Sequence, residues 1–270
     1  MSMRHVEIGD GTLAVLDQGS GPPVLLVHGF PLDHSMWSGQ IEALSARCRV
    51  IAPDLRGFGG SGVAEGIATM EGFADDLARL LDALQIDEPT TFVGLSMGGY
   101  IAWQFWRRHA DRLGRLVLCD TRALPDADET ARGRLLTAER VLVQGPSVIA
   151  EPMLERLFAP ATRAAQAACI ESVRRVILGT SPLSIAAALR GMAQRVDATP
   201  WLPLLDVPTL VVCGEHDAIS PPTEMRALAA ALPRANYVQL DGVGHMAPLE
   251  DPAAFNQQFM NWLAAAPIRK

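Results

Sequence analysis

FVGLSMGGYIA, residues 92–102, places one serine among three glycines where an apolar run gives way to a helical pattern. Glycine is unfavourable in the interior of strands and helices, so its density here requires a cause. Residues 94–98, GLSMG, match G-x-S-x-G, a motif in which the serine occupies a tight turn between a strand and a helix. Flanking side chains would clash in such a strained turn. The motif therefore predicts that the Ser96 hydroxyl is exposed at the carboxyl edge of a sheet, where ligands bind in open α/β folds.

Short apolar runs alternate with helical patterns along the chain. Uninterrupted apolar runs of this length are typical of strands buried on both faces. Their alternation with helices predicts an α/β fold, a mostly parallel sheet with helices on both faces. The N-terminal run TLAVLDQG predicts additional antiparallel edge strands. The predicted strands are 24–27, 50–52, 91–93, 116–119, 209–213 and 237–240, and the predicted helices are 36–46, 70–84, 97–109, 223–232 and 252–264.

One connection is much longer than a simple crossover. Between residues 120 and 207 the sequence is rich in alanine, arginine and leucine, is broken by several prolines, and contains no convincing strand. This pattern predicts three to five short helices, and an insertion of this length usually serves as a lid or a binding element. We therefore predict a core made of residues 1–120 and 206–270, with a helical cap over 121–205.

Composition excludes several classes of protein. The chain has 270 residues and is 49% apolar, which suits one sizeable core. Its net charge is −7. The sequence has no cluster of lysine or arginine, which argues against binding to nucleic acid or to an anionic membrane. The polar N-terminus and the lack of any run of ~20 apolar residues predict neither a signal peptide nor a membrane span. The four cysteines form no CxxC pair, which argues against a zinc or redox site and fits a cytoplasmic protein.

A serine hydroxyl needs a base to become a nucleophile. Among six histidines, His245 is the best candidate, because it lies in GVGHMAPLE, between the last predicted strand and the last predicted helix. This position agrees with the chain order Ser, Asp, His expected after a G-x-S-x-G turn. His28, which ends a strand in LLVHGF, is predicted to be structural.

Two aspartates could orient the base. Asp217 follows strand 209–213, and Asp120 ends strand 116–119. Asp217 is preferred, because the segment GEHDAIS leaves a loop long enough to turn the carboxylate inward. Asp120 remains the alternative.

An oxyanion hole needs two backbone donors aimed at the developing charge. The residue after the nucleophile supplies one donor, and the loop after an earlier strand supplies the other. In this sequence those positions are Met97 and Phe30, the latter in VHGF.

A second glycine-rich segment does not carry a nucleotide. Residues 57–62, GFGGSG, match G-x-G-x-x-G, but DLR separates them from the preceding strand and the next helical pattern begins only near Thr69. Without a helix N-terminus beside the glycines, a pyrophosphate has no binding site. We expect no organic cofactor and no metal.

The segments HGFPLDHSMW, DLRGFGGS, GLSMGG, GEHDAISPP and GHMAPLEDP resemble, in this order, successive blocks of the α/β-hydrolase superfamily. The resemblance spans about residues 24–264 and implies an eight-stranded sheet, a catalytic triad of Ser96, Asp217 and His245, an oxyanion hole formed by Phe30 and Met97, and a helical cap. By DTRA and ALRGMAQR, the chain is similar to 3-oxoadipate enol-lactonase-like hydrolases and small carboxylesterases. Haloalkane dehalogenases and epoxide hydrolases resemble this fold but have aspartate at the position of the serine.

We therefore expect a serine hydrolase that cleaves a small-molecule carboxylic ester or lactone through an acyl-enzyme. Two alternatives remain: another reaction of the same triad, such as carbon–carbon bond hydrolysis or metal-free peroxidase chemistry, and a non-catalytic ligand receptor. The sequence does not indicate an oligomeric state, and only the general frequency of homodimers among soluble proteins points to a homodimer. The candidates for an apolar substrate pocket are Trp37, Leu124, Leu142, Phe158, Ile185 and Met246. Each is equally well explained by packing of the cap on the core, and for any one of them packing is the favoured interpretation.

Overall fold

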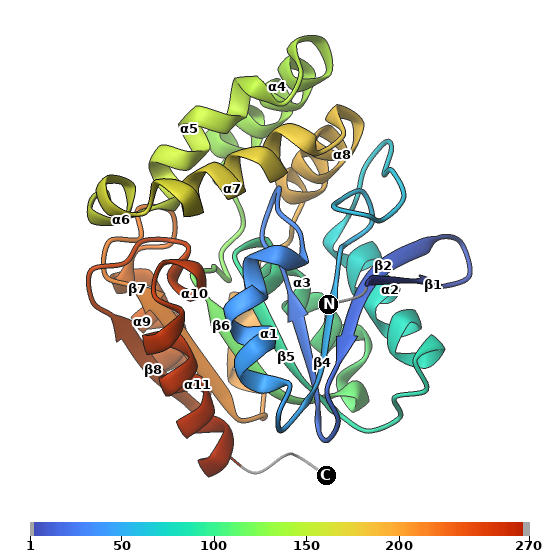
Figure 1. The fold of residues 1–270 in the computed structure, drawn as a ribbon, viewed down its shortest axis with the longest axis vertical. Coiled ribbons are helices and arrows are strands. Elements are labelled where there is room, and N and C mark those ends of the chain that lie inside the picture. Colours follow the sequence, from blue (N-terminus) through green and yellow to red (C-terminus); the bar gives the residue numbers. More distant parts are fainter. Residues whose placement is uncertain (1–2, 267–270) are drawn as a thin grey trace.

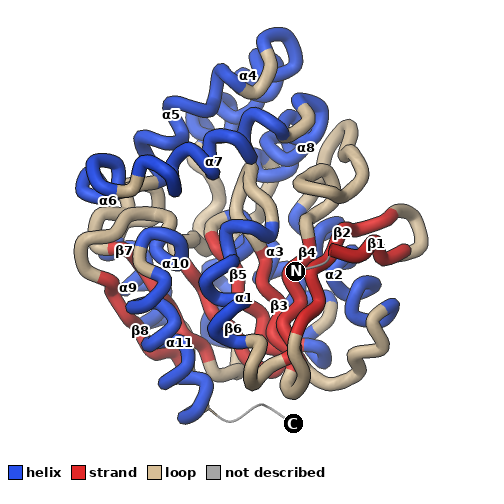
Figure 2. Tube along the Cα trace, in the orientation of Figure 1, coloured by secondary structure: helices blue, strands red, loops and turns tan. Residues whose placement is uncertain are grey.

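The computed structural model describes residues 3–266, which form a sheet of eight strands covered by helices (Figures 1 and 2). The strand order is β1-β2-β4-β3-β5-β6-β7-β8. Strand β2 is antiparallel to β1 and β4, and all other neighbouring pairs are parallel. The predicted mostly parallel α/β fold is therefore confirmed. The strands are β1 (Met3–Glu7), β2 (Thr12–Gln18), β3 (Pro23–Val27), β4 (Arg49–Pro53), β5 (Thr90–Leu95), β6 (Leu113–Cys119), β7 (Thr209–Gly214) and β8 (Ala235–Leu240).

The central strands are buried along their whole length, as their uninterrupted apolar sequences predict. Every residue of β3, β5 and β7 is buried. Strand β5 is longer than predicted, because Gly94 and Leu95 continue its pairing with Leu118 and Cys119 of β6. The sheet therefore extends up to the residue before Ser96.

The core helices cover both faces of the sheet. In Figure 1, α1 and α11 lie in front of the sheet, and α2, α3 and α9 lie behind it. The predicted helix over 36–46 is divided into a 3₁₀ turn, η1, and the helix α1, because the Asp33 side chain caps η1 by accepting from the Ser35 amide. The core helices are η1 (His34–Trp37), α1 (Ser38–Leu44), α2 (Met70–Ala83), α3 (Met97–Arg108), η2 (Ala110–Arg112), α9 (Pro222–Ala231), α10 (Ala247–Glu250) and α11 (Pro252–Ala265).

The long connection between β6 and β7 is helical. Residues 121–205, here called the cap, lie above the sheet in Figure 1, and α4 packs against both α5 and α8. The cap contains five α-helices, the upper end of the predicted number, followed by a 3₁₀ helix. These are α4 (Asp128–Gln144), α5 (Ser147–Leu157), α6 (Pro160–Ala165), α7 (Ala167–Gly179), α8 (Pro182–Ala193) and η3 (Thr199–Leu204).

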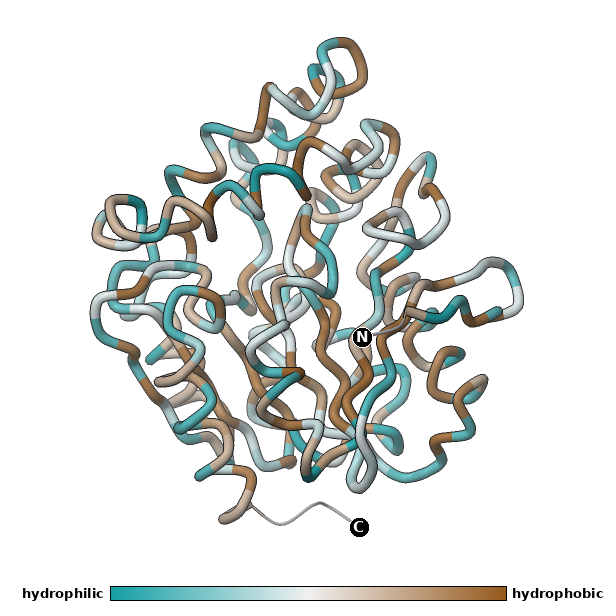
Figure 3. Tube along the Cα trace, viewed as in Figure 1, coloured by the Kyte–Doolittle hydropathy of each residue, from teal (hydrophilic) through white to brown (hydrophobic). Residues whose placement is uncertain are grey.

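Apolar residues gather in the central strands, whereas the surrounding helices alternate polar and apolar residues along their length (Figure 3). This pattern places the core of the molecule between the sheet and the helices. Within residues 3–266, no single helix has the length and apolar content to cross a membrane, and the pair Ala167–Gly179 and Pro182–Ala193 reaches them together but is bent by 95°.

Candidate active site

Ser96 lies in the turn between β5 and α3 and has a backbone φ of 53°. Such a conformation costs on the order of 1–3 kcal/mol for a residue other than glycine and persists only where its surroundings hold it. Here the Ser96 amide donates to the carbonyl of Cys119 at 3.0 Å, and the Ser96 carbonyl accepts from the Thr121 hydroxyl at 2.7 Å. The end of β6 therefore holds the serine in place on both sides of its backbone.

The glycines around Ser96 are required by close packing. A Cβ on Gly94 would lie within 3.0 Å of the Gly98 backbone, and one on Gly98 would lie within 3.0 Å of the Val27 carbonyl oxygen. A Cβ on Gly99 would lie equally close to the Thr121 side chain. Helix α3 can therefore begin directly beneath the end of β3 only with glycine at these positions.

His245 lies between β8 and α10, and its Nδ1 is 2.9 Å from Oδ2 of Asp217. Both side chains are buried. The other carboxylate oxygen of Asp217 accepts from the amides of Ile219 at 2.7 Å and Ser220 at 3.0 Å. Burial alone would raise the pKa of Asp217, but His245 and these amides outweigh it and hold the pKa below its usual value. Asp217 is therefore a carboxylate that fixes the orientation of the His245 ring.

Asp120 lies beside this pair and is fully buried. Its Oδ1 accepts from the Gly214 amide at 2.8 Å, and its Oδ2 has no hydrogen-bond partner within the described chain. Burial and the neighbouring charge of Asp217 raise the pKa of Asp120 well above its usual value. This shift favours the protonated form of Asp120, and of the two candidate acids Asp217 is the one that contacts His245.

Ser96 and His245 line one cavity of about 540 Å³ beneath the cap. Phe30 lines the same cavity from the loop after β3, and Met97 is the first residue of α3. The first amides of a helix have no partner within the helix, so the Met97 amide is available to a ligand. Gly29 brings the Phe30 loop against the serine, because a Cβ there would lie 2.8 Å from the Leu95 side chain.

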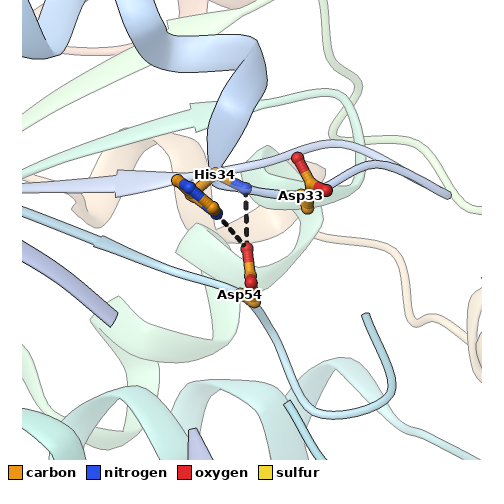
Figure 4. A group of neighbouring side chains, drawn as sticks. All are labelled: Asp33, His34 and Asp54. Carbon is orange, nitrogen blue, oxygen red and sulfur yellow. Dashed lines mark hydrogen bonds and ion pairs between the residues drawn. The ribbon is translucent and has the colours of Figure 1, made fainter. Parts of the chain in front are cut away.

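Two further contacts hold the Phe30 loop in place. His28, predicted to be structural, is buried, accepts from the Leu55 amide through Nε2 at 3.0 Å, and has its Nδ1 2.9 Å from the Gly29 carbonyl oxygen. Desolvation lowers the pKa of His28 and so keeps the ring neutral. On the other side of Phe30, His34 donates its amide to Oδ1 of Asp54 at 2.8 Å and places Nδ1 2.7 Å from the same oxygen (Figure 4).

The GFGGSG segment wraps around this aspartate. The Gly60 amide donates to Oδ2 of Asp54 at 2.8 Å, and a Cβ on Gly59 would overlap the carboxylate. Helix α2 begins only at Met70, so the glycine segment does not lead directly into the helix that follows it.

Donor atoms of Asp33, His34 and Asp54 all lie within 4.8 Å of one another, as do those of Asp120, Cys213 and Asp217. In the first group, Oδ1 of Asp54 already binds His34 and Oδ1 of Asp33 accepts from Ser35. The first group thus joins the loop after β3 to the loop after β4. The second group includes Asp217, the aspartate that contacts His245.

Glu250, which the sequence analysis did not single out, joins the base to the cap. It is 4% exposed and accepts through Oε1 from the amides of Gly244 and Met246, at 2.9 and 3.2 Å. Through Oε2 it accepts from the Ala159 amide at 2.9 Å and from the Thr162 hydroxyl at 2.5 Å. The first two donors flank His245, and the last two belong to the start of α6, so one carboxylate holds both segments.

None of the six candidate pocket residues lines this cavity, and most of them pack in the core, which is the interpretation that the sequence favours. Trp37, Ile185 and Met246 are completely buried in the core, and Phe158 is almost completely buried. Leu142 packs against the core from α4, and Leu124 is 47% exposed. Hydrophobicity made all six candidates for the pocket, but five of them pack in or against the core and Leu124 lies at the surface.

The cavity is lined by a different set of residues, many of them polar. Helices α4 and α5 each turn one stripe toward it, with the spacing of three and four residues that places side chains on one helix face. This spacing groups the residues of one helix face, but which face meets the cavity depends on how the cap helices pack. The residues are Phe30, Ser96, Tyr100, Arg122, Asp126, Thr130, Gly133, Arg134, Thr137, Arg140, Val148, Ile149, Pro152, Met153, Arg156, Leu157, Leu189, Met192, Ile219 and His245.

Comparison with known proteins agrees with this geometry. A thermophilic esterase from Thermogutta terrifontis, solved with malate bound, is 46% identical, with a TM-score of 0.95 over 98% of this chain and 99% of that one. The enol-lactonase from Burkholderia xenovorans LB400 is 30% identical, with a TM-score of 0.90 over 97% and 100% of the two chains. The 3-oxoadipate enol-lactonase 2 of Acinetobacter baylyi is 26% identical over 243 residues, which are 90% of this chain and 89% of that protein.

These similarities run through the whole length of the chain, and they include the strands that carry Ser96, Asp217 and His245. Residues 24–258 match the model of the alpha/beta hydrolase family. That range holds all three residues together with the Phe30 loop and the cap. The chain belongs to the alpha/beta hydrolase family and is similar to its esterases and enol-lactonases.

Proposed function

We propose that this chain is a serine hydrolase that cleaves a carboxylic ester or lactone through an acyl-enzyme. The observation that carries the proposal is the buried Asp217–His245 pair, which shares one cavity with a serine held at positive φ. The similarity to an esterase and an enol-lactonase supports the same reaction class.

The reaction begins with the protons on His245. Because anionic Asp217 lies against Nδ1, that nitrogen carries the proton and Nε2 is left to accept one. As the Ser96 hydroxyl attacks the substrate carbonyl carbon, its proton passes to Nε2. The imidazolium that forms is stabilised by the Asp217 carboxylate.

The carbonyl oxygen becomes an oxyanion during this attack. The amides of Met97 and Phe30 donate to it, one from the start of α3 and one from the loop after β3. Collapse of the tetrahedral intermediate breaks the carbon–oxygen bond of the ester, and His245 gives its proton to the leaving alcohol. Water then attacks the acyl-enzyme by the same steps and releases the acid. In a lactone, the alcohol that forms remains part of the acyl chain, so hydrolysis of the acyl-enzyme releases a single hydroxy acid.

Stopped-flow hydrolysis of p-nitrophenyl esters, from acetate to octanoate, tests the proposal. We expect a burst of p-nitrophenol followed by steady turnover, and the loss of both in Ser96→Ala. Ser20→Ala is the matched control, because Ser20 is exposed in the loop before β3, at the end of the sheet away from Ser96. Turnover that survives in Ser96→Ala would contradict the assignment of the nucleophile.

A further inference from the structure

The cavity has two chemically different walls, formed by neighbouring cap helices α4 and α5 (Figure 1). From α4 it is lined by Thr130, Gly133, Arg134, Thr137 and Arg140, a stripe without any apolar side chain. From α5 it is lined by Val148, Ile149, Pro152, Met153 and Leu157, with Arg156 as the only charged member. A substrate that fits both walls has a hydrocarbon part and a strongly polar part.

The cavity is cationic, although the protein as a whole is acidic. Apart from His245, the charged residues that line the cavity are four arginines and one aspartate, whereas the chain has a net charge of −7. Two of these arginines are neutralised by the protein. Arg122 pairs with Glu224 at 2.6 Å, and Arg134 pairs with Asp126 at 2.5 Å.

Arg140 and Arg156 differ from the other two. Both are exposed, and neither forms an ion pair with an acidic side chain of residues 3–266. They come from different helices but line the same cavity as Ser96. Arg132, by contrast, is exposed on α4 but does not line the cavity. Two guanidinium groups without partners at a cavity wall form a binding site for an anion.

We propose that the natural substrate is an ester or lactone that carries a free carboxylate, which Arg140 and Arg156 bind. Guanidinium groups match the planar geometry of a carboxylate and bind it with charge-assisted hydrogen bonds. The apolar α5 wall covers the hydrocarbon between this carboxylate and the carbonyl at Ser96. The inference rests on the proposed hydrolase function and adds the substrate class to it.

The test compares two esters of equal chain length that differ in charge, p-nitrophenyl hemiglutarate and p-nitrophenyl pentanoate. The wild-type protein should hydrolyse the hemiglutarate with a kcat/KM about tenfold higher, since a hydrogen bond to a charged group contributes that much. The Arg140→Gln/Arg156→Gln double variant should lose this advantage mainly through KM, while its kcat/KM for the pentanoate stays within about twofold. The advantage in the wild-type protein should also shrink as salt is raised, because salt screens exposed charges.

Arg132→Gln is the matched control and should leave both kcat/KM values unchanged. Glutarate should inhibit the wild-type protein competitively, and its Ki should rise about tenfold in the double variant. Equal preference for the hemiglutarate in the wild-type protein and the double variant, or equal inhibition by glutarate, would overturn the inference. If pentanoate is cleaved in a Ser96-dependent way without any preference for the hemiglutarate, the hydrolase proposal stands and this inference alone is wrong. If neither ester is cleaved, both proposals are wrong.

Discussion

The carboxylate of Asp217 lies 2.9 Å from the imidazole of His245, while the carboxyl group of Asp120, at the end of the next strand, bonds to the Gly214 amide instead. The two acids are neighbours with opposite pKa shifts: burial and the charge on Asp217 raise the pKa of Asp120, whereas His245 and two backbone amides lower the pKa of Asp217. The structure therefore shows which of the two aspartates contacts His245, a choice that the sequence alone left open.

Replacing Asp217 by Asn should lower kcat by about 10⁴ while the fold is kept, because the amide would hold the His245 ring in the wrong tautomer. Steady-state kinetics and far-UV circular dichroism would measure the two effects. Asp120→Asn is the natural comparison and should retain activity within about tenfold, since a neutral amide replaces a neutral acid. A larger loss in Asp120→Asn than in Asp217→Asn would make Asp120 the orienting acid.

Asp120 should also leave a signature in stability. Its pKa is raised in the folded protein, so above about pH 4 the unfolded chain releases a proton that the folded chain keeps. Unfolding is therefore favoured progressively as pH rises from about 4 toward the raised pKa, by up to about 1.4 kcal/mol per pH unit. Asp120→Asn removes this cost, so its urea midpoint relative to the wild-type protein should rise between pH 4 and pH 7. A difference that stays constant over this range would show that Asp120 is ionised in the folded state.

Replacing a glycine of the Ser96 turn by alanine should have the opposite effect on stability from the same replacement in α4. Gly98→Ala should lower the thermal midpoint and abolish activity, because the new methyl group would overlap the Val27 carbonyl. Gly133→Ala, in the middle of α4 where a Cβ meets nothing within 4 Å, should stabilise the protein by up to about 1 kcal/mol. Differential scanning calorimetry of the two variants would decide the matter, and an unaffected Gly98→Ala would contradict the packing argument.

Glu250→Gln should reduce both activity and stability, because the amide nitrogen cannot accept the hydrogen bonds that one carboxylate oxygen accepts now. We expect kcat to fall about tenfold or more and the free energy of unfolding to fall by roughly 1–3 kcal/mol. Thr162→Val removes only the hydroxyl donor on the cap side, so it should spare kcat. Glu42→Gln, an exposed change on α1, should alter neither quantity. A Glu250→Gln variant with normal kcat would show that His245 keeps its position without this contact.

The parts of the molecule that could be predicted from the sequence are those fixed by local rules. Buried parallel strands require unbroken apolar runs, and a serine at a strained turn requires glycines that cannot be replaced, so the strands and the Ser96 turn were visible as patterns. The choice of Asp217 over Asp120 was also possible, because the loop after β7 has to bring a carboxylate back toward the sheet edge.

The cap lining depends on how separate helices face one another, which no local rule determines. Ile185 has the hydrophobicity expected of a pocket residue, but packing within the core uses it completely. Arg140 looks like an ordinary surface residue until the roll of α4 is known. Glu250 was missed for a similar reason, since an acid beside the start of a predicted helix usually indicates capping. Its two donors in the cap, Ala159 and Thr162, lie 91 and 88 residues away in the sequence.

Three of the four donors to Glu250 are backbone amides, which every residue except proline supplies. The attachment between the cap and the catalytic loop therefore depends little on which side chains surround it. Substitutions along the cap can reshape the cavity without removing these three backbone donors. The shape of the cavity can therefore change while the loop that holds His245 stays attached to the cap.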